Sequence, residues 1–116
     1  MEFKESDGYK KDLKKLAKRF KTLPEDLKTL QKVLEVMPDE RPPISARVSG
    51  LGVSETIIKV KRIACRAMKN KGSNTGLRLI YCYKKEGEEI DLIELYFKGD
   101  KENEDRTRII EWCNTE

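Results

Sequence analysis

The sequence predicts an α+β fold, in which an N-terminal helical hairpin packs on a small twisted antiparallel β-sheet and a short helix follows. Three observations predict it. Two apolar patterns with helical spacing lie before residue 38, three strand-like stretches follow residue 55, and a last helical pattern lies near the C-terminus. A chain of 116 residues and 13.5 kDa has the size of one domain, so we expect a single domain over residues 1–116.

The N-terminal part predicts a short strand and then a helix. Residues 1–5 can form a strand with Phe3 facing inward, and Asp7 and Gly8 interrupt the pattern. The helix is expected over residues 9–20, because apolar residues recur there at i, i+3, i+4 and i+7: Leu13, Leu16, Ala17 and Phe20.

A second helix is expected from about Thr22 to Met37. Pro24 suits the first turn of a helix, the acidic residues after it favour the positive end of the helix dipole, and Pro38 ends the pattern. Its inward residues are Leu27, Leu30, Val33, Leu34 and Met37. Residues 38–55 contain prolines and glycines, and we expect an irregular loop that wraps the sheet and acts as a passive connector or as a flexible rim of a site.

The second half predicts a three-strand meander. Residues 56–68 read as a strand whose alternation slips near Lys61 and Arg62, which indicates a β-bulge. After a polar loop at 70–76, strands are expected over 77–85 and 89–98, with a turn between them at Glu86 and Gly87. A turn at 98–101 then leads to a short helix over 104–112, with Ile109 and Trp112 facing inward.

Positive charge is concentrated between Thr56 and Lys85. That segment holds no acidic residue and nine basic ones: Lys59, Lys61, Arg62, Arg66, Lys69, Lys71, Arg78, Lys84 and Lys85. The whole chain carries +4, so the other 86 residues carry −5. A basic sheet surface beside a glycine-containing loop suits a polyanion such as RNA or DNA, although a solvated lysine face is the ordinary alternative.

Composition excludes several classes of site. The chain has no histidine, which excludes histidine-dependent nucleophiles, a histidine general base and the ordinary histidine-bearing zinc sites. Cys65, Cys82 and Cys113 are odd in number and widely spaced within apolar patterns, as expected of buried thiols in a reducing cytoplasm. No apolar run approaches the length of a membrane span, so we expect a cytoplasmic protein without a membrane partner.

Three short patterns occur in a characteristic order. They are Ile58-Lys59-Val60-Lys61, then Gly76-Leu77-Arg78-Leu79-Ile80-Tyr81, then Lys98-Gly99-Asp100-Lys101 after the last strand. Together with the helical hairpin before them, they resemble the RelE/ParE toxin superfamily of type II toxin–antitoxin modules. The resemblance covers nearly the whole chain, and it implies a RelE-like fold.

The resemblance also implies an activity. Many members are mRNA interferases, endoribonucleases that cleave mRNA in the ribosomal A site without a metal or cofactor. The neighbouring 2′-OH attacks the phosphodiester, which requires a base for that hydroxyl, cations for the phosphorane and an acid for the leaving 5′-oxygen. The implied partners are mRNA, the ribosome and a cognate antitoxin protein.

Particular residues fall on the family's site. The resemblance makes Arg78 the cation of the transition state, and it places Lys59 and Lys61 on the strand lysines that contact the scissile region. RelE itself has an arginine where this chain has Gly99, with Lys98 beside it, and a C-terminal tyrosine that this chain lacks. The acid/base role would then pass to Tyr96 or to a carboxylate: Glu94, Asp100 or Asp105. The structural alternative for Arg78 is an ion pair with a carboxylate on the neighbouring strand, such as Glu94. For Tyr81, Tyr83 and Tyr96 it is a place in the core.

Further basic residues are candidates for RNA-backbone contacts, namely Arg62, Arg66, Lys69, Lys71 and Lys101. No aromatic residue lies in the loop that carries most of them, so they favour phosphate positioning over base reading. Two other functions stay open: a ParE-like toxin that inhibits DNA gyrase by protein contact, and a non-catalytic RNA- or ribosome-binding module.

Overall fold

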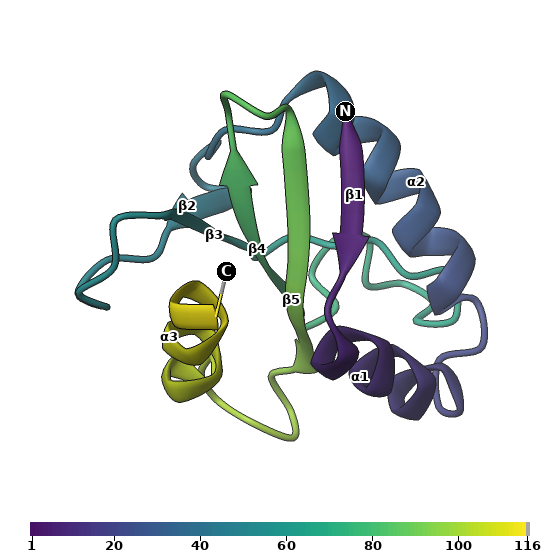
Figure 1. Ribbon diagram of the computed structural model, residues 1–116. Helices are drawn as coiled ribbons and strands as arrows, with labels where there is room; N and C mark the ends of the chain where they lie inside the picture. The colour runs from purple at the N-terminus through teal and green to yellow at the C-terminus, as the bar shows by residue number, and fades with distance from the viewer. Residues whose placement is uncertain (116) are drawn as a thin grey trace.

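The computed structural model describes residues 1–115 and has an α+β architecture, as the sequence predicts. Its elements are β1 (Glu2–Glu5), α1 (Asp7–Ala17), α2 (Leu23–Val36), β2 (Ser45–Arg47), β3 (Thr56–Val60), β4 (Leu77–Lys84), β5 (Glu89–Phe97) and α3 (Arg106–Thr115). The strands form one five-stranded sheet in the order β1-β5-β4-β3-β2 (Figure 1). None of the helices in this part of the chain is long and apolar enough to cross a membrane.

The sheet is mixed. β3, β4 and β5 form the expected antiparallel meander, and β2 adds an antiparallel edge to β3. β1 instead runs parallel to β5, with Phe3 opposite Ile90. A parallel neighbour requires a long connection, and here the two N-terminal helices and the rest of the sheet lie between the paired strands in sequence.

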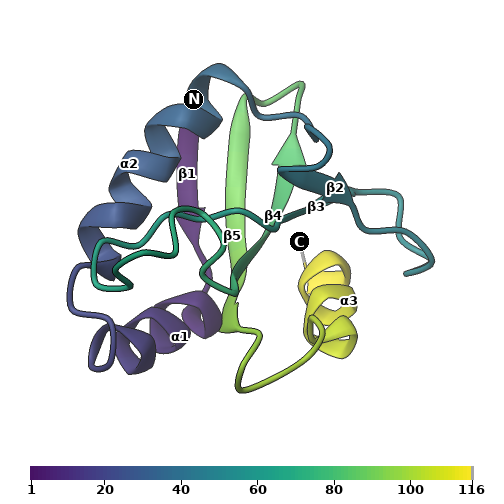
Figure 2. The same cartoon turned by 180° about the vertical axis from the view of Figure 1, so that it is seen from behind.

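Each side of the sheet has its own core. α1 and α2 lie on one side, where α1 crosses the end of β1 and α2 runs beside the strands, and α3 lies on the other side (Figures 1 and 2). The core under α1 and α2 includes Leu27, Ile58, Leu79 and Leu92, and the smaller core under α3 includes Ile80 and Ile109. The alternation of side chains along β4 supplies both, because successive residues face opposite sides.

The helix boundaries follow local signals. Ser6 caps α1 by accepting a hydrogen bond from the backbone nitrogen of Tyr9 at 3.1 Å, so the helix begins at Asp7, two residues before the expected start. The helix ends at Ala17, earlier than predicted, although Phe20 still packs against the core. α2 begins as predicted, with Pro24 in its first turn, and α3 extends over Arg106–Thr115 in place of the expected residues 104–112.

Two strand predictions were wrong. The expected strand over residues 56–68 ends at Val60, and the following segment leaves the sheet while Ile63 and Cys65 remain buried in the core under the helices. The apolar residues after Val60 are spaced like those of a strand because they are buried in the core, although they belong to a loop. In addition, Ser45–Arg47 pairs with β3 inside the region predicted to be irregular. Three residues without an alternating pattern gave no sequence signal for this strand.

The β-bulge lies in β5, not near Lys61 as predicted. Tyr81 pairs with Leu92 and Ile80 pairs with Glu94, so Ile93 is the extra residue. A bulge shifts the alternation of every later side chain to the other face. As a result, Leu95 packs under the helices and Tyr96 faces the α3 side, the side to which Arg78 also points.

A candidate cationic active site

A polar hollow of about 230 Å³ opens on the α3 side of the sheet, beyond the part that α3 covers. It is built from β3, β4 and the end of β5, together with the chain that leads to α3. Its lining residues are Lys59, Lys61, Arg78, Tyr96, Lys98, Glu102 and Asn103. The structure thus brings together all five residues that the sequence suggests for catalysis. Their catalytic roles stay a prediction.

A second polar hollow continues the first toward β2. The two share Lys59 and Lys61, and the second adds Arg47 and Arg106. We call the two hollows together the cationic trough. Its charged lining residues are the basic Arg47, Lys59, Lys61, Arg78, Lys98 and Arg106, and the acidic Glu102 and Glu104. This excess of positive charge makes the trough suited to a polyanion.

Arg78 is fixed by the backbone and not by a carboxylate. Its Nη1 donates to the carbonyl oxygen of Lys61 at 2.9 Å and to that of Leu77 at 3.1 Å. No ion pair joins Arg78 to an acidic side chain within residues 1–115, so the alternative of a pair with Glu94 was wrong. The carbonyl contacts orient the guanidinium without neutralising it, which leaves its charge available to a ligand.

Four basic residues line the first hollow, and within residues 1–115 only Lys59 forms an ion pair with an acidic side chain. Its Nζ lies 2.7 Å from Oε1 of Glu104, whose side chain is only 6% exposed. Burial alone would raise the pKa of Glu104, but the hydrogen bond from Lys59 and the charges of Lys59 and Arg106 hold it below its usual value. Glu104 therefore stays ionised beside Lys59. The amines of Lys61 and Lys98 contact no carboxylate in the described chain.

Tyr96 forms the wall of the hollow at the end of β5. It is buried, and Lys101 Nζ lies 5.1 Å from the centre of its ring. Burial, and then the charges of Glu104 and Glu94, raise the pKa of Tyr96 to about 12, while Arg78 opposes them. The phenol accordingly remains protonated near neutral pH, as a proton donor requires. Tyr81, by contrast, is fully buried and donates its hydroxyl hydrogen to the carbonyl of Pro38, so its predicted place in the core is confirmed.

The carboxylates proposed from the sequence as acid or base lie outside the hollow. Glu94 is buried, pairs with Lys101 and accepts a hydrogen bond from the backbone nitrogen of Asp105 at 2.8 Å. Asp100 pairs with Arg19 at 2.6 Å, and Asp105 caps the start of α3. Sequence reasoning missed Glu102, which lines the hollow from the chain before α3. Its position depends on how that chain folds back, and no local pattern indicates it.

The proposed RNA-contacting residues are not gathered at the trough. Lys101 lies over Tyr96, as described, and Arg62 donates to the side chain of Asn74 at 3.2 Å. The chain between β3 and β4 passes over the helix-covered side of the sheet toward α2 (Figure 2). There Arg66 Nε lies 3.0 Å from Oδ1 of Asp26, which fastens the loop to the first turn of α2. Lys69 and Lys71 are exposed on this loop.

Gly99 lies directly against the ring of Phe97. A Cβ atom at this position would lie 2.5 Å from Cε2 of Phe97, which is closer than a side chain can approach. Phe97 itself packs edge-on against Phe20 with ring centroids 5.3 Å apart. A side chain at position 99 would therefore require the Phe97 ring to move. Lys98, the residue before it, lines the hollow with its positive charge.

Metal-ligating side chains do not converge in the described part of the chain. No group of three or more cysteine, aspartate or glutamate residues within residues 1–115 is arranged to hold a metal ion. Cys65, Cys82 and Cys113 are each buried and free, as expected. The buried thiols belong to the two cores and not to the trough.

Comparison with solved structures shows a likeness over most of the chain. The chain is similar in structure to a crystal structure of a metal-bound toxin from Helicobacter pylori, with a TM-score of 0.50 and 22% sequence identity. The match covers 87% of this chain and 98% of that chain. No protein-family model matches the sequence, and no curated protein matches it. The chain thus shares its fold with that protein.

Proposed function

We propose that this protein is a RelE-like toxin of a type II toxin–antitoxin system and acts as an endoribonuclease that cleaves mRNA. The observation that carries the proposal is the convergence of Lys59, Lys61, Arg78 and Lys98 around Tyr96 in one hollow. The toxin-like fold supports it. The H. pylori toxin is metal-bound, but the donor groups described in this chain do not form a site for a metal, so no step is assigned to one.

The cations suit the most demanding part of the reaction. Attack of a 2′-OH on the phosphodiester places additional negative charge on the phosphorane oxygens. Arg78 is held in place before the substrate arrives and cannot lose its charge, so it stabilises that developing charge without reorganisation. Lys61 and Lys98 contact no carboxylate among residues 1–115 and can hold the phosphates on either side of the scissile bond.

Tyr96 and Glu102 are suited to the two proton transfers. Glu102 is the one carboxylate lining the first hollow in the described chain, and it would accept the proton of the 2′-OH. Tyr96 would donate its proton to the leaving 5′-oxygen, for which its raised pKa keeps it protonated. The P–O5′ bond breaks as the O2′–P bond forms, and the products are a 2′,3′-cyclic phosphate and a 5′-hydroxyl. Exchange with water restores both side chains.

The proposed partners follow from the charge of the trough. An mRNA strand, held at the ribosome, would occupy it during cleavage. A cognate antitoxin would block it by laying an acidic segment across the same basic residues.

The test is controlled expression of the wild type and of Arg78→Ala, scored by growth and by primer-extension mapping of mRNA ends. We expect growth arrest with new mRNA ends from the wild type, and the loss of both in Arg78→Ala. Arg41→Ala is the matched control, because Arg41 is exposed and lies outside the trough. Arrest without new ends would favour the gyrase-type toxin. Intact RNA bound by a non-toxic, folded protein would favour a binding module.

A further inference from the structure

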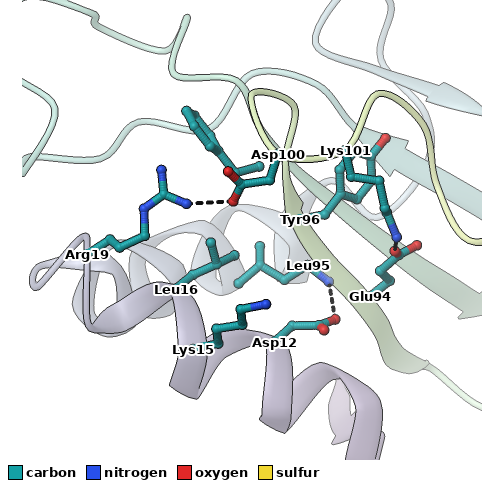
Figure 3. A pocket seen from close by; sticks show the side chains of 10 residues that line it. Asp12, Lys15, Leu16, Arg19, Glu94, Leu95, Tyr96, Asp100 and Lys101 are labelled. Carbon is teal, nitrogen blue, oxygen red and sulfur yellow. Dashed lines mark hydrogen bonds and ion pairs between the residues drawn. The ribbon is translucent and has the colours of Figure 1, made fainter.

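A third hollow lies between α1 and the end of β5, and the proposed reaction does not use it (Figure 3). Its lining combines an apolar floor with a charged rim. The floor residues are Leu16, Leu95 and Phe97, the rim residues are Asp12, Lys15, Arg19, Glu94, Asp100 and Lys101, and Tyr96 completes the wall. Figure 3 shows Leu16 and Leu95 between the α1 side chains and the turn that carries Asp100. We call this hollow the α1 pocket.

The size of the α1 pocket suits a small planar group. Its volume is about 210 Å³, whereas sites for drug-sized ligands occupy roughly 300–1,000 Å³. An apolar floor beneath polar groups at the rim is the usual arrangement for a flat heterocycle with hydrogen-bonding edges. A single nucleobase has this size and this character.

The α1 pocket adjoins the proposed reaction site at one residue. Tyr96 lines both this pocket and the hollow that contains Arg78. An RNA strand whose scissile phosphate lies against Arg78 would thus pass Tyr96, where the α1 pocket begins. Proteins that read single-stranded RNA hold such unpaired bases against aromatic rings or arginine planes.

Arg19 provides a fixed plane at the mouth of the α1 pocket. Its guanidinium carbon lies 5.1 Å from the ring centre of Phe20 and 5.2 Å from that of Phe97. Nη1 of the same guanidinium lies 2.6 Å from Oδ2 of Asp100. Two rings and one carboxylate thus hold an exposed guanidinium that a base can stack against.

The free hydrogen-bonding groups of the rim select among the bases. Asp12 already accepts from the backbone nitrogen of Leu95 and from Arg108, and Glu94 is satisfied by Lys101 and by a backbone nitrogen. Within residues 1–115, Lys15 Nζ has no partner, and Oδ1 of Asp100 has none either. The rim thus offers one cationic donor and one anionic acceptor.

We infer that the α1 pocket binds an unpaired guanine of the RNA, next to the scissile phosphate, an inference that rests on the proposed ribonuclease function. Guanine presents O6 and N7 as acceptors for a lysine, and its N1–H and amino group are donors for a carboxylate. Uracil lacks an amino group and offers a carboxylate a single donor. Lys15 and Asp100 therefore determine the specificity, and Arg19 positions the base.

The test measures binding to RNA that cannot be cleaved. Fluorescein-labelled pentamers with 2′-O-methyl groups on every ribose are titrated with the full chain, and binding is followed by anisotropy. One pentamer is all uracil, and the others carry one guanine, adenine or cytosine at the central position. We expect the guanine pentamer to bind about fivefold more tightly than the uracil pentamer, the low end for such contacts because the rim is exposed.

Matched variants locate the preference. Asp100→Asn and Lys15→Ala should each weaken the guanine pentamer more than the uracil pentamer, so that the preference for guanine is lost. Asp39→Asn and Lys10→Ala, both at exposed positions outside the pocket, should keep the full preference. Thermal unfolding of each variant checks that it is folded. If the Asp100 variant is unfolded, the Lys15 variant alone tests whether the pocket causes the preference for guanine.

The possible results are distinct. Equal affinity of all pentamers for the wild type, or a preference that survives both variants, would overturn the α1 pocket as a guanine site, as would the absence of any binding. None of these results decides whether Arg78 supports cleavage, which the mapping of mRNA ends tests separately. Conversely, a guanine preference lost in both variants would support the pocket even if expression produced no new mRNA ends.

Discussion

The face of the sheet under α1 and α2 is apolar along the length of its strands, whereas the face toward α3 is apolar only where α3 and the chain before β3 cover it. β4 shows both. Leu77 and Leu79 are buried on the first face. On the second face, Ile80 is buried in the core that α3 covers, and Arg78 lines the hollow next to that core. The same strand alternation therefore gives a core where a helix excludes water and a charged hollow where none does, because an unpaired charge under a helix would cost several kcal/mol.

This difference implies that stability and the proposed activity depend on adjacent residues of one strand. A substitution on the helix-covered face should act on the free energy of unfolding. A substitution in the cationic trough should act on RNA. The following predictions test that separation, beginning with the largest effect.

Leu79→Ala should lower the free energy of unfolding by about 2–5 kcal/mol, because Leu79 is 1% exposed and its removal leaves a cavity between the sheet and the helices. Urea denaturation followed by circular dichroism measures it. Arg78→Ala is the neighbouring control, and it should change the same free energy by no more than about 1 kcal/mol, since its lost hydrogen bonds are partly exposed to water. Equal destabilisation by the two would contradict the separation of the faces.

Arg78→Ala should lower the rate of RNA cleavage by about 10²–10³-fold, the range for loss of one fixed donor to a developing oxyanion. The measurement is the rate of appearance of mRNA ends in a translating extract. Arg41→Ala again serves as the control. A cleavage rate within a few-fold of the wild type would show that Arg78 does not contribute to catalysis. It would not contradict the description of the fold.

Asp91, which lies on the α3 side of the sheet, should make the free energy of unfolding depend on pH. Burial, and then the neighbouring Glu89, raise the pKa of Asp91 to about 6, although Lys84 opposes them. Because the folded chain then binds a proton that the unfolded chain releases, stability should increase by roughly 1–2 kcal/mol as the pH falls from 8 to 5.

Unfolding free energies of the wild type and Asp91→Asn at several pH values test this prediction. Asp91→Asn should remove most of the dependence between pH 5 and 8, since asparagine does not titrate. A wild-type stability that rises with pH across this window would show that other groups dominate.

Glu104→Gln should have the smallest effect, a loss of about 0.5–1 kcal/mol of stability at pH 7, because the pair with Lys59 is only partly exposed. Since the pKa of Glu104 is lowered in the folded protein, its contribution is present above the pKa of the unfolded carboxyl. The contribution is lost as the pH falls through the folded value. The stabilities of the wild type and the variant should thus converge in strong acid, and thermal unfolding over a pH series from 7 down to 2 would detect this. A difference that stays constant over the whole series would argue against the ion pair as its source.

The sequence by itself determined the class of fold and indicated which residues line the candidate site. Helical spacing located α1 and α2, and the alternation in residues 77–97 located β4 and β5, because these signals depend on neighbouring residues that share a face. For the same reason Lys59 and Arg78 could be assigned to strands.

Other features were decided only by the tertiary structure, since they depend on residues distant in sequence. The bulge at Ile93 arises from the pairing of β5 with β4, and it turns Tyr96 toward Arg78. The sequence pattern predicted that Arg66 contacts RNA. In the fold, Arg66 instead pairs with Asp26, which lies 40 residues away in sequence. The local sequence pattern indicates which residues share a face of a helix or strand. Long-range packing decides which charged side chains remain unpaired, because an ion pair forms only where the fold brings two opposite charges together.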